Sequence, residues 1–229
     1  MALYAIGDLH LSLESDKPMD VFGGRWEGYV DKLREGLRVI GPEDTTVLLG
    51  DLSWAMELER AVEDFSFISA IPGRKIILKG NHDYWWSTAA KFYRFCAEHA
   101  FENMYVLNNN CWFYGDTALC GTRGWFYEED LKGTHDEKVF RRELGRLETS
   151  LKAAGEHEKL CFLHYPPKYG GYECPEILEL LRAYDVRACY YGHLHAESLR
   201  MAFTGRAYDV DFRCVSADYV NFMPQKVLD

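Results

Sequence analysis

The sequence lacks several features that are typical of secreted and membrane proteins. Its seven cysteines are scattered, with no Cys-x-x-Cys pair, which argues against a zinc ribbon or a disulfide framework and favours a reducing compartment. No apolar run approaches the roughly 20 residues of a membrane helix. The N-terminus has no basic segment and meets a charge early, at Asp8, so we expect no signal peptide. These absences predict a cytoplasmic protein that does not associate with a membrane.

Basic charge is also scarce. The chain has 26 lysine and arginine residues against 36 aspartate and glutamate residues, which gives a formal net charge of −10. An acidic protein repels a nucleic-acid backbone at long range, so we do not expect nucleic acid as a partner. No repeat, low-complexity tract or proline-rich linker divides the 229 residues, and we expect residues 1–229 to form a single domain. The sequence does not indicate an oligomeric state.

What the sequence does contain is a series of short apolar runs separated by stretches with helical periodicity, as in α/β proteins. Buried strands are expected at residues 3–6, 46–49, 75–78, 160–163 and 188–191. Helices are expected at 26–40, 58–70, 87–100, 135–154 and 175–184. Residues 105–107, 111–114 and 118–120 are interpreted as successive antiparallel strands, with a turn at 108–110, and residues 198–215 as strand-like.

Each of the five main strands is followed at once by potential metal ligands. In an α/β sheet, ligands bind outside the carboxyl ends of the strands, so these side chains should converge on one crevice. Each block alone has a plainer explanation, because Asp and Asn often cap helices and a single His is often a core residue. Their joint occurrence favours a site formed by Asp8 with His10, Asp51, Asn81 with His82 and Asp83, His164, and His193 with His195.

In this order the blocks resemble the calcineurin-like metallophosphoesterase superfamily, whose pattern is D-x-H, G-D, G-N-H-D/E, H and G-H-x-H. The resemblance extends from Asp8 to His195. It implies an α/β fold of two mixed β-sheets packed face to face with flanking helices, a four-layer sandwich with a two-metal site at the strand ends. It also implies that Asp51 bridges the two metals, with Asp8, His10 and His195 on one of them and Asn81, His164 and His193 on the other.

The donor types indicate which cofactors are expected. A set rich in imidazole nitrogen suits Mn, Fe, Co, Ni or Zn better than Mg or Ca, and we expect two divalent transition-metal ions, with Mn favoured. His82 is left over from the ligand set. Because the matching histidine of the family lies beside the substrate, His82 is expected to protonate the leaving alkoxide or to stabilise the transition state, with Asp83 orienting its ring.

The predicted function is that of a dinuclear-metal hydrolase of a small phosphomonoester or phosphodiester. The reaction would be in-line attack of a metal-bridging hydroxide, and a diester is slightly preferred because a general acid is retained. The block that begins at Gly50 lacks the arginine of the phosphoprotein phosphatases, and Asn81-His82 lacks the Asn-Arg of the lipid-A pathway hydrolases. Two alternatives are a metal-dependent nuclease, disfavoured by the charge of −10, and a non-catalytic scaffold, disfavoured by the intact His82 and ligand set.

Substrate contacts are predicted from three residues near the site loops. Arg123 lies between glycines in a loop after a strand and could grip a phosphate bidentately, although a surface ion pair is an equal alternative. Trp54 and Trp85 could stack on a substrate group, whereas aromatics of this kind are more often core residues. The long segment 11–24 is expected to form a wall or lid near the site.

Overall fold

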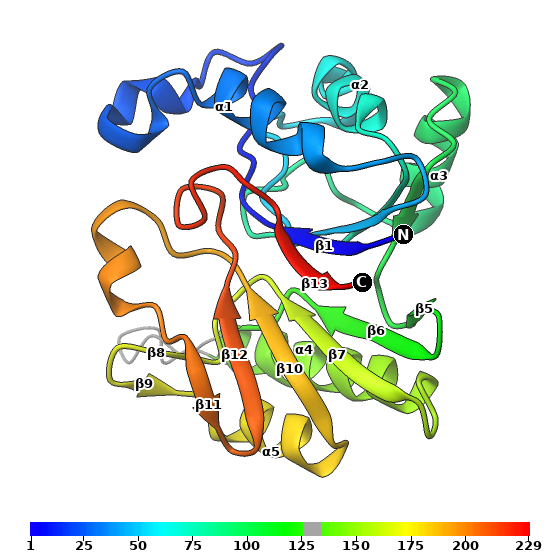
Figure 1. Cartoon of the computed structure of the whole chain (residues 1–229), viewed down its shortest axis with the longest axis vertical. Helices are drawn as coiled ribbons and strands as arrows, with labels where there is room; N and C mark the ends of the chain where they lie inside the picture. The colour runs from blue at the N-terminus through cyan, green and yellow to red at the C-terminus, as the bar shows by residue number, and fades with distance from the viewer. Residues whose placement is uncertain (126–133) are drawn as a thin grey trace.

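The structure is a computed structural model that describes residues 1–125 and 134–229, with side chains described for 1–125 and 137–229. Two mixed β-sheets form its centre (Figure 1). The first sheet has the order β13-β1-β2-β3-β4, with β1 at Leu3–Ile6, β2 at Thr45–Leu48, β3 at Arg74–Ile77, β4 at Met104–Val106 and β13 at Gln225–Leu228. Strands β1 to β4 are parallel, and β13 joins β1 in the antiparallel direction.

The second sheet has the order β11-β12-β10-β7-β6-β5. Its bounds are β5 Trp112–Tyr114, β6 Thr117–Thr122, β7 Glu158–Leu163, β10 Val186–Tyr191, β11 Gly205–Ala207 and β12 Val210–Cys214. The four central strands are parallel, and β5 and β11 are antiparallel edges. A small hairpin pairs β8, Lys168–Tyr169, with β9, Tyr172–Glu173.

Five α-helices within the described residues cover the outer faces of the sheets. Helices α1 (Tyr29–Gly36), α2 (Val62–Ala70) and α3 (Ala89–Glu98) lie over the first sheet, and α4 (Thr134–Ala153) and α5 (Pro175–Ala183) lie over the second (Figure 1). Short 3-10 helices occupy Met19–Phe22, Gly24–Trp26, Leu37–Val39, Leu58–Arg60 and Ala196–Met201. None of the helices in the described parts of the chain is long and apolar enough to cross a membrane.

Three apolar clusters separate the four layers. Alternation along a strand sends neighbouring side chains to opposite faces. In β1, Leu3 and Ala5 therefore pack between the sheets, where they meet Leu160 and Phe162 of β7, while Ile6 packs under the helices of the first sheet. The expected α/β class, with two mixed sheets packed face to face and helices outside, is confirmed.

The structure differs from the sequence-based expectation in three segments. Strand β4 is not antiparallel to β5 and β6 but joins the first sheet parallel to β3, so residues 108–110 carry the chain from one sheet to the other. Residues 198–201 belong to a 3-10 helix, because Asp218 and Ser198 cap the turn at His195 and Ala196. Strand β13 was not anticipated.

Candidate metal centre

The seven predicted ligands come from loops at the carboxyl ends of parallel strands in both sheets. Asp8 and His10 follow β1, Asp51 follows β2 and Asn81 follows β3. His164 follows β7, and His193 and His195 follow β10. The two sheets therefore meet at this edge of the sandwich, where their loops form one cluster of side chains.

Four of these residues have a left-handed backbone. The φ angles are 61° at Asp8, 47° at His10, 51° at Asp51 and 72° at His193. This conformation costs a non-glycine residue about 1–3 kcal/mol, and it persists only where the surrounding structure imposes it. Four of the seven candidate ligands therefore depend on the surrounding loops for their backbone conformation.

Asp8, His10 and His195 form the first group, and their donor atoms all lie within 4.8 Å of one another. The Nε2 atoms of His10 and His195 are 3.3 Å apart, and Nε2 of His195 is 3.4 Å from Oδ1 of Asp8. A carboxylate and two imidazoles directed at one point form a suitable donor set for a divalent transition metal.

Asn81, His164 and His193 form the second group. Oδ1 of Asn81 lies 2.6 Å from Nε2 of His164 and 2.9 Å from Nδ1 of His193, and these two nitrogens are 3.3 Å apart. Burial lowers the pKa of both His164 and His193 to about 3, so both imidazoles are neutral at physiological pH. A neutral imidazole is the form that binds a metal.

Asp51 faces both groups. Its Oδ2 is 3.7 Å from Nε2 of His10 and 3.6 Å from Nε2 of His164. Its Oδ1 accepts the backbone N–H of His82 at 2.8 Å, but the buried Oδ2 has no hydrogen-bond partner among the described residues. Burial, followed by the neighbouring Asp83 and Asp8, raises the pKa of Asp51 well above its usual range. A cation on each side of this oxygen would remove that electrostatic cost, so the residues present fit two metal ions.

Further hydrogen bonds orient the histidines. Nδ1 of His164 lies 3.0 Å from the carbonyl oxygen of Leu49, and Nδ1 of His195 lies 3.0 Å from Oδ1 of Asp218. With Nδ1 as the donor in both contacts, each ring in its neutral form would present the Nε2 lone pair to the centre. Burial opposes protonation of His195, yet Asp8 and Asp218 outweigh it and raise its pKa to about 10. A dication beside Asp8 would compete with that proton.

Asp218 was missed in the sequence analysis. It is fully buried and also accepts the backbone N–H of Ala196 at 3.0 Å. A signal was present, because Ser216-Ala217-Asp218 follows the strand at residues 210–214 just as the other blocks follow their strands. The signal is weak by itself, since this block holds a single carboxylate and no histidine.

Two strand-end glycines make room for the carboxylates. A Cβ at Gly192 would overlap Oδ2 of Asp8, and one at Gly80 would overlap Oδ1 of Asp51. Any side chain at these positions would displace a candidate ligand. The first residue of the Gly-Asn-His-Asp and Gly-His-Leu-His blocks is therefore a glycine because a side chain there would occupy the space of a neighbouring carboxylate.

His82 lies beside the two groups. Its half-buried ring is 5.9 Å from the ring of His10, and its Nδ1 lies 3.1 Å from the hydroxyl of Tyr84. Burial, followed by the nearby His195, lowers the pKa of His82. A bound phosphoester anion would act in the opposite direction and favour the protonated ring.

The structure gives Asp83 a role different from the expected orientation of His82. The Asp83 carboxylate is fully buried and accepts backbone N–H groups from Gly80, Asp51 and Leu52 at 2.7–2.9 Å. It also accepts the indole N–H of Trp85 at 2.9 Å. Asp83 therefore fixes the loop that carries Asp51 to the loop that carries Asn81.

The two predicted tryptophans also have different environments. Trp85 is only 4% exposed and packs on Phe65 in the core with a ring distance of 4.8 Å, so it is not placed to contact substrate. Trp54 is half-buried and stacks on His10 at 5.0 Å, with His82 at 4.5 Å. Trp54 thus forms a wall of the centre.

The segment 11–24 also lies against this wall. The indole N–H of Trp54 donates to Sδ of Met19 at 3.4 Å, and Nζ of Lys17 lies 5.5 Å from the Trp54 ring. The expectation of a wall agrees with these contacts.

Arg123 has an ion-pair partner. Its Nη2 is 3.6 Å from Oε1 of the buried Glu143, and its guanidinium lies 4.7 Å from the Trp125 ring. Its carbonyl oxygen accepts the backbone N–H groups of His164 and Tyr165. Arg123 therefore lies next to the centre and lines a separate pocket with Lys79, described below.

Comparison with known proteins identifies the family of this chain. The family model for the calcineurin-like phosphoesterases matches residues 1–197, which include all seven candidate ligands. The chain belongs to the calcineurin-like phosphoesterase family. It is accordingly a metal-dependent phosphoesterase, a hydrolase of phosphoesters in a family that uses a dinuclear metal centre. The comparison with curated proteins gives no match.

Several solved structures share the fold at low sequence identity. A phosphopantetheinyl hydrolase from Mycobacterium tuberculosis is 13% identical, with 99% of this chain and 95% of that chain covered and a TM-score of 0.58. A protein of unknown function from Aquifex aeolicus is 17% identical, with coverage of 98% and 95% and a TM-score of 0.53. A protein from Thermus thermophilus is 15% identical, with coverage of 84% and 81% and a TM-score of 0.52.

Proposed function

We propose that this phosphoesterase holds two divalent transition-metal ions, with Mn²⁺ favoured, and hydrolyses a small phosphomonoester or phosphodiester. Asp51 would bridge the ions, with Asp8, His10 and His195 on one side and Asn81, His164 and His193 on the other. The observation that carries the proposal is the buried Oδ2 of Asp51, which has no hydrogen-bond partner among the described residues and lies 3.6–3.7 Å from an imidazole nitrogen of each group.

The bound ions would supply Lewis-acid charge and an activated water for in-line displacement at phosphorus. The chain's own residues orient the reactants. The His82 ring lies 5.9 Å from the ring of His10 and would donate its proton to the leaving oxygen. Trp54, stacked on His10, would exclude water from one side of the substrate.

We prefer a diester slightly over a monoester, because a general acid, His82, is retained. One structural neighbour is named a phosphopantetheinyl hydrolase, so a phosphopantetheine ester belongs among the test substrates. We further propose that residues 1–229 act as one domain, since both sheets contribute ligands, and that the protein works in the cytoplasm, where its seven free cysteines would stay reduced.

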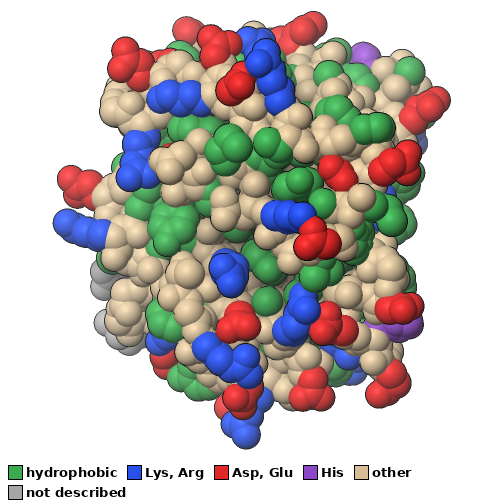
Figure 2. Space-filling view, in the orientation of Figure 1, with side chains coloured by type: hydrophobic (Ala, Val, Ile, Leu, Met, Phe, Trp, Pro, Cys, Tyr) green, Lys and Arg blue, Asp and Glu red, His purple; other side chains and the backbone are tan. Residues whose placement is uncertain are grey.

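A nuclease is the weaker alternative. The net charge is −10, and acidic and basic side chains are interspersed on the face shown in Figure 2, which has no continuous basic stripe. A scaffold that kept only the fold would not need His82 or strained ligand backbones.

The test is metal analysis combined with hydrolysis assays. Protein reconstituted with Mn²⁺ should bind two ions per chain and hydrolyse at least one member of a panel of alkyl, nucleoside and phosphopantetheine mono- and diesters. Chelation should abolish the activity, and Mn²⁺ should restore it. At most one ion per chain under saturating metal would contradict the dinuclear proposal.

A further inference from the structure

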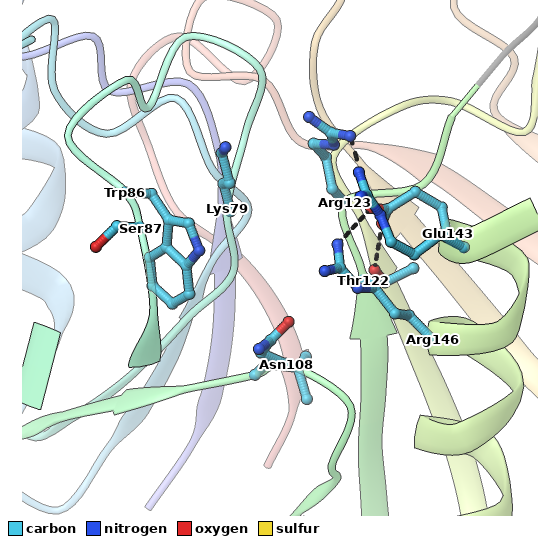
Figure 3. Close-up of a pocket in the computed structure, with 10 residues that line it drawn as sticks. Lys79, Trp86, Ser87, Asn108, Thr122, Arg123, Glu143 and Arg146 are labelled. Carbon is cyan, nitrogen blue, oxygen red and sulfur yellow. Dashed lines mark hydrogen bonds and ion pairs between the residues drawn. The ribbon is translucent and has the colours of Figure 1, made fainter. Parts of the chain in front are cut away.

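A basic pocket of about 190 Å³ lies beside the candidate metal centre, and none of the seven candidate ligands, all of which the structure describes, lines it. The loop after β3 forms one wall with Lys79, Trp86 and Ser87 (Figure 3). The end of β6 and helix α4 form the opposite wall, with Asn108 between them (Figure 3). The cationic side chains that line the pocket are Lys79, Arg123, Arg142 and Arg146.

One carboxylate, that of Glu143, lines the pocket together with these cations. Glu143 is 2% exposed and accepts the Thr122 hydroxyl at 2.8 Å and Nη1 of Arg146 at 2.6 Å, with Nη2 of Arg123 at 3.6 Å. Four cations minus one carboxylate leave a formal charge of +3 in the lining. This excess occurs in a protein whose net charge is −10.

Part of the positive charge has no partner within the described residues. Lys79 and Arg142 form no ion pair with any residue that the structure describes. Nε of Arg123 is buried and finds no acceptor there. Lys79 and Arg123 are both partly withdrawn from water, where like charges repel one another. An anion in the pocket would relieve this repulsion and give the unpaired donors an acceptor.

The size and position of the pocket indicate what kind of anion it takes. Pockets for a whole small ligand measure about 300–1,000 Å³, so a pocket of about 190 Å³ suits a single group. Its lining is continuous with the metal-centre loops. Lys79 precedes Asn81 by two residues, and the carbonyl of Arg123 accepts the backbone N–H of His164 at 3.1 Å.

We propose that this pocket binds a second anionic group, a phosphate or carboxylate, through Lys79, Arg123 and Arg142. The group would belong to a substrate whose reacting phosphoester occupies the metal centre, and this part rests on the proposed function. A free anion of the same chemistry would use the same donors, and the experiment separates the two sources.

The first measurement uses inorganic sulfate as the probe and needs neither metal nor turnover. Sulfate should raise the melting temperature of the metal-free wild-type protein saturably, and also that of Asp51→Asn, in which metal binding is weakened. Lys79→Met and Arg142→Ala should each weaken the apparent sulfate affinity about tenfold, the effect of losing one charge-assisted contact. Both side chains lack a described partner, so neither change leaves Glu143 unpaired.

Arg141→Ala is the matched control. Arg141 is the neighbour of Arg142 on α4, but it is 75% exposed, pairs with Glu137 and does not line the pocket. Its replacement should leave sulfate binding unchanged. Equal sulfate affinity in wild type, Lys79→Met and Arg142→Ala would overturn the proposal.

The second measurement identifies the source of the anion. The inhibition constants of adenosine 5′-monophosphate and adenosine 3′,5′-bisphosphate are compared, with the best substrate found in the assay. If the second group belongs to the substrate, the bisphosphate binds more tightly, and Lys79→Met and Arg142→Ala reduce its advantage about tenfold. If the variants lose sulfate binding but still bind the bisphosphate more tightly than the monophosphate by the wild-type factor, the pocket takes a free anion.

The two proposals can fail separately. Loss of sulfate binding in the variants, with no ester hydrolysed by the wild-type protein, would support the pocket and refute the proposed function. Hydrolysis of esters by the wild-type protein, with sulfate binding unaffected by Lys79→Met and Arg142→Ala, would support the proposed function and refute the anion pocket.

Discussion

At the residue scale, the carboxylate of Asp51 is shared between two sets of donors. Oδ2 faces His10 and His164, and Oδ1 accepts the backbone N–H of His82. This division means that one side chain holds the metal groups together and also fixes the loop of the proposed general acid. Its replacement should therefore affect more of the site than the loss of any other single candidate ligand.

We expect Asp51→Asn to retain less than one metal ion per chain, whereas Asn81→Ala retains about one, because Asn81 contacts only the second group. The measurement is metal analysis after gel filtration from equal Mn²⁺, with the exposed Asp209→Asn as the control. If Asp51→Asn kept as much metal as Asn81→Ala, Asp51 would not be the bridge.

His82 provides a second prediction at this scale. His82→Ala should keep both ions but lose about 10²–10⁴-fold in rate on alkyl or nucleoside esters, because an alkoxide needs a proton as it leaves. The loss should be much smaller on a nitrophenyl ester, whose leaving group departs nearly unaided. Steady-state rates on the two ester classes make the comparison, and Tyr84→Phe, which removes only the hydroxyl near His82, is the control.

Two other results for His82→Ala would change its assignment. Loss of a metal ion would make His82 a ligand. An equal loss of rate with both leaving groups would mean that it stabilises the phosphoryl oxygens and does not protonate the leaving group.

At the scale of elements, the junctions between strands and loops place the ligands. Gly192→Ala should displace Asp8, since the new Cβ would overlap its carboxylate, and it should weaken metal binding at the first group by at least tenfold. Gly145→Ala, in α4 with open space around it, is the matched control and should stabilise the protein by about 0.5–1 kcal/mol. Calorimetric titration with Mn²⁺ and urea unfolding measure the two effects. Unchanged metal affinity in Gly192→Ala would show that Asp8 does not depend on this spacing.

The same junctions explain how much could be predicted from the sequence. A short apolar run followed by a potential metal ligand, in four of the five cases after a glycine, is a local pattern, and it correctly located β1, β2, β3, β7 and β10. The resemblance of the five blocks then identified the family. Local patterns were enough because each block lies within a few residues of its strand.

Features that depend on distant contacts could not be predicted in this way. Asp83 bonds the backbone of Asp51 across 32 positions, and His195 meets Asp218 across 23. Strand β4 pairs with β3 in one sheet, although its sequence neighbours β5 and β6 lie in the other. Trp85 follows the site block directly, but its ring packs on Phe65 in the core. Sequence proximity to a motif did not determine side-chain direction.

At the scale of the whole molecule, the candidate ligands join the two sheets. The loops of the first sheet contribute Asp8, His10, Asp51 and Asn81, and those of the second contribute His164, His193 and His195. Bound ions would therefore connect the sheets at one edge of the sandwich. Elsewhere the sheets are held by side chains such as Leu3, Leu160 and Phe162.

We expect metal to raise the free energy of unfolding by about 2.7 kcal/mol for each independent ion at a concentration 100 times its dissociation constant. Urea unfolding with and without chelator measures this change, and Asp51→Asn, which loses the bridge, should show little of it. Hydrogen exchange should slow in the loops after both β1 and β10. Protection confined to the loops of one sheet would mean that the metal does not link the two.

Strand β13 has a consequence for the order of events during synthesis. Its residues 225–228 cover the edge of β1, and Leu3 is paired with Leu228. The ribosome releases β1 long before β13, so the nascent chain presents an uncovered strand edge through most of translation. Such an edge can pair with other chains. Chaperone dependence and co-translational aggregation should therefore depend on when β13 becomes available to pair with β1.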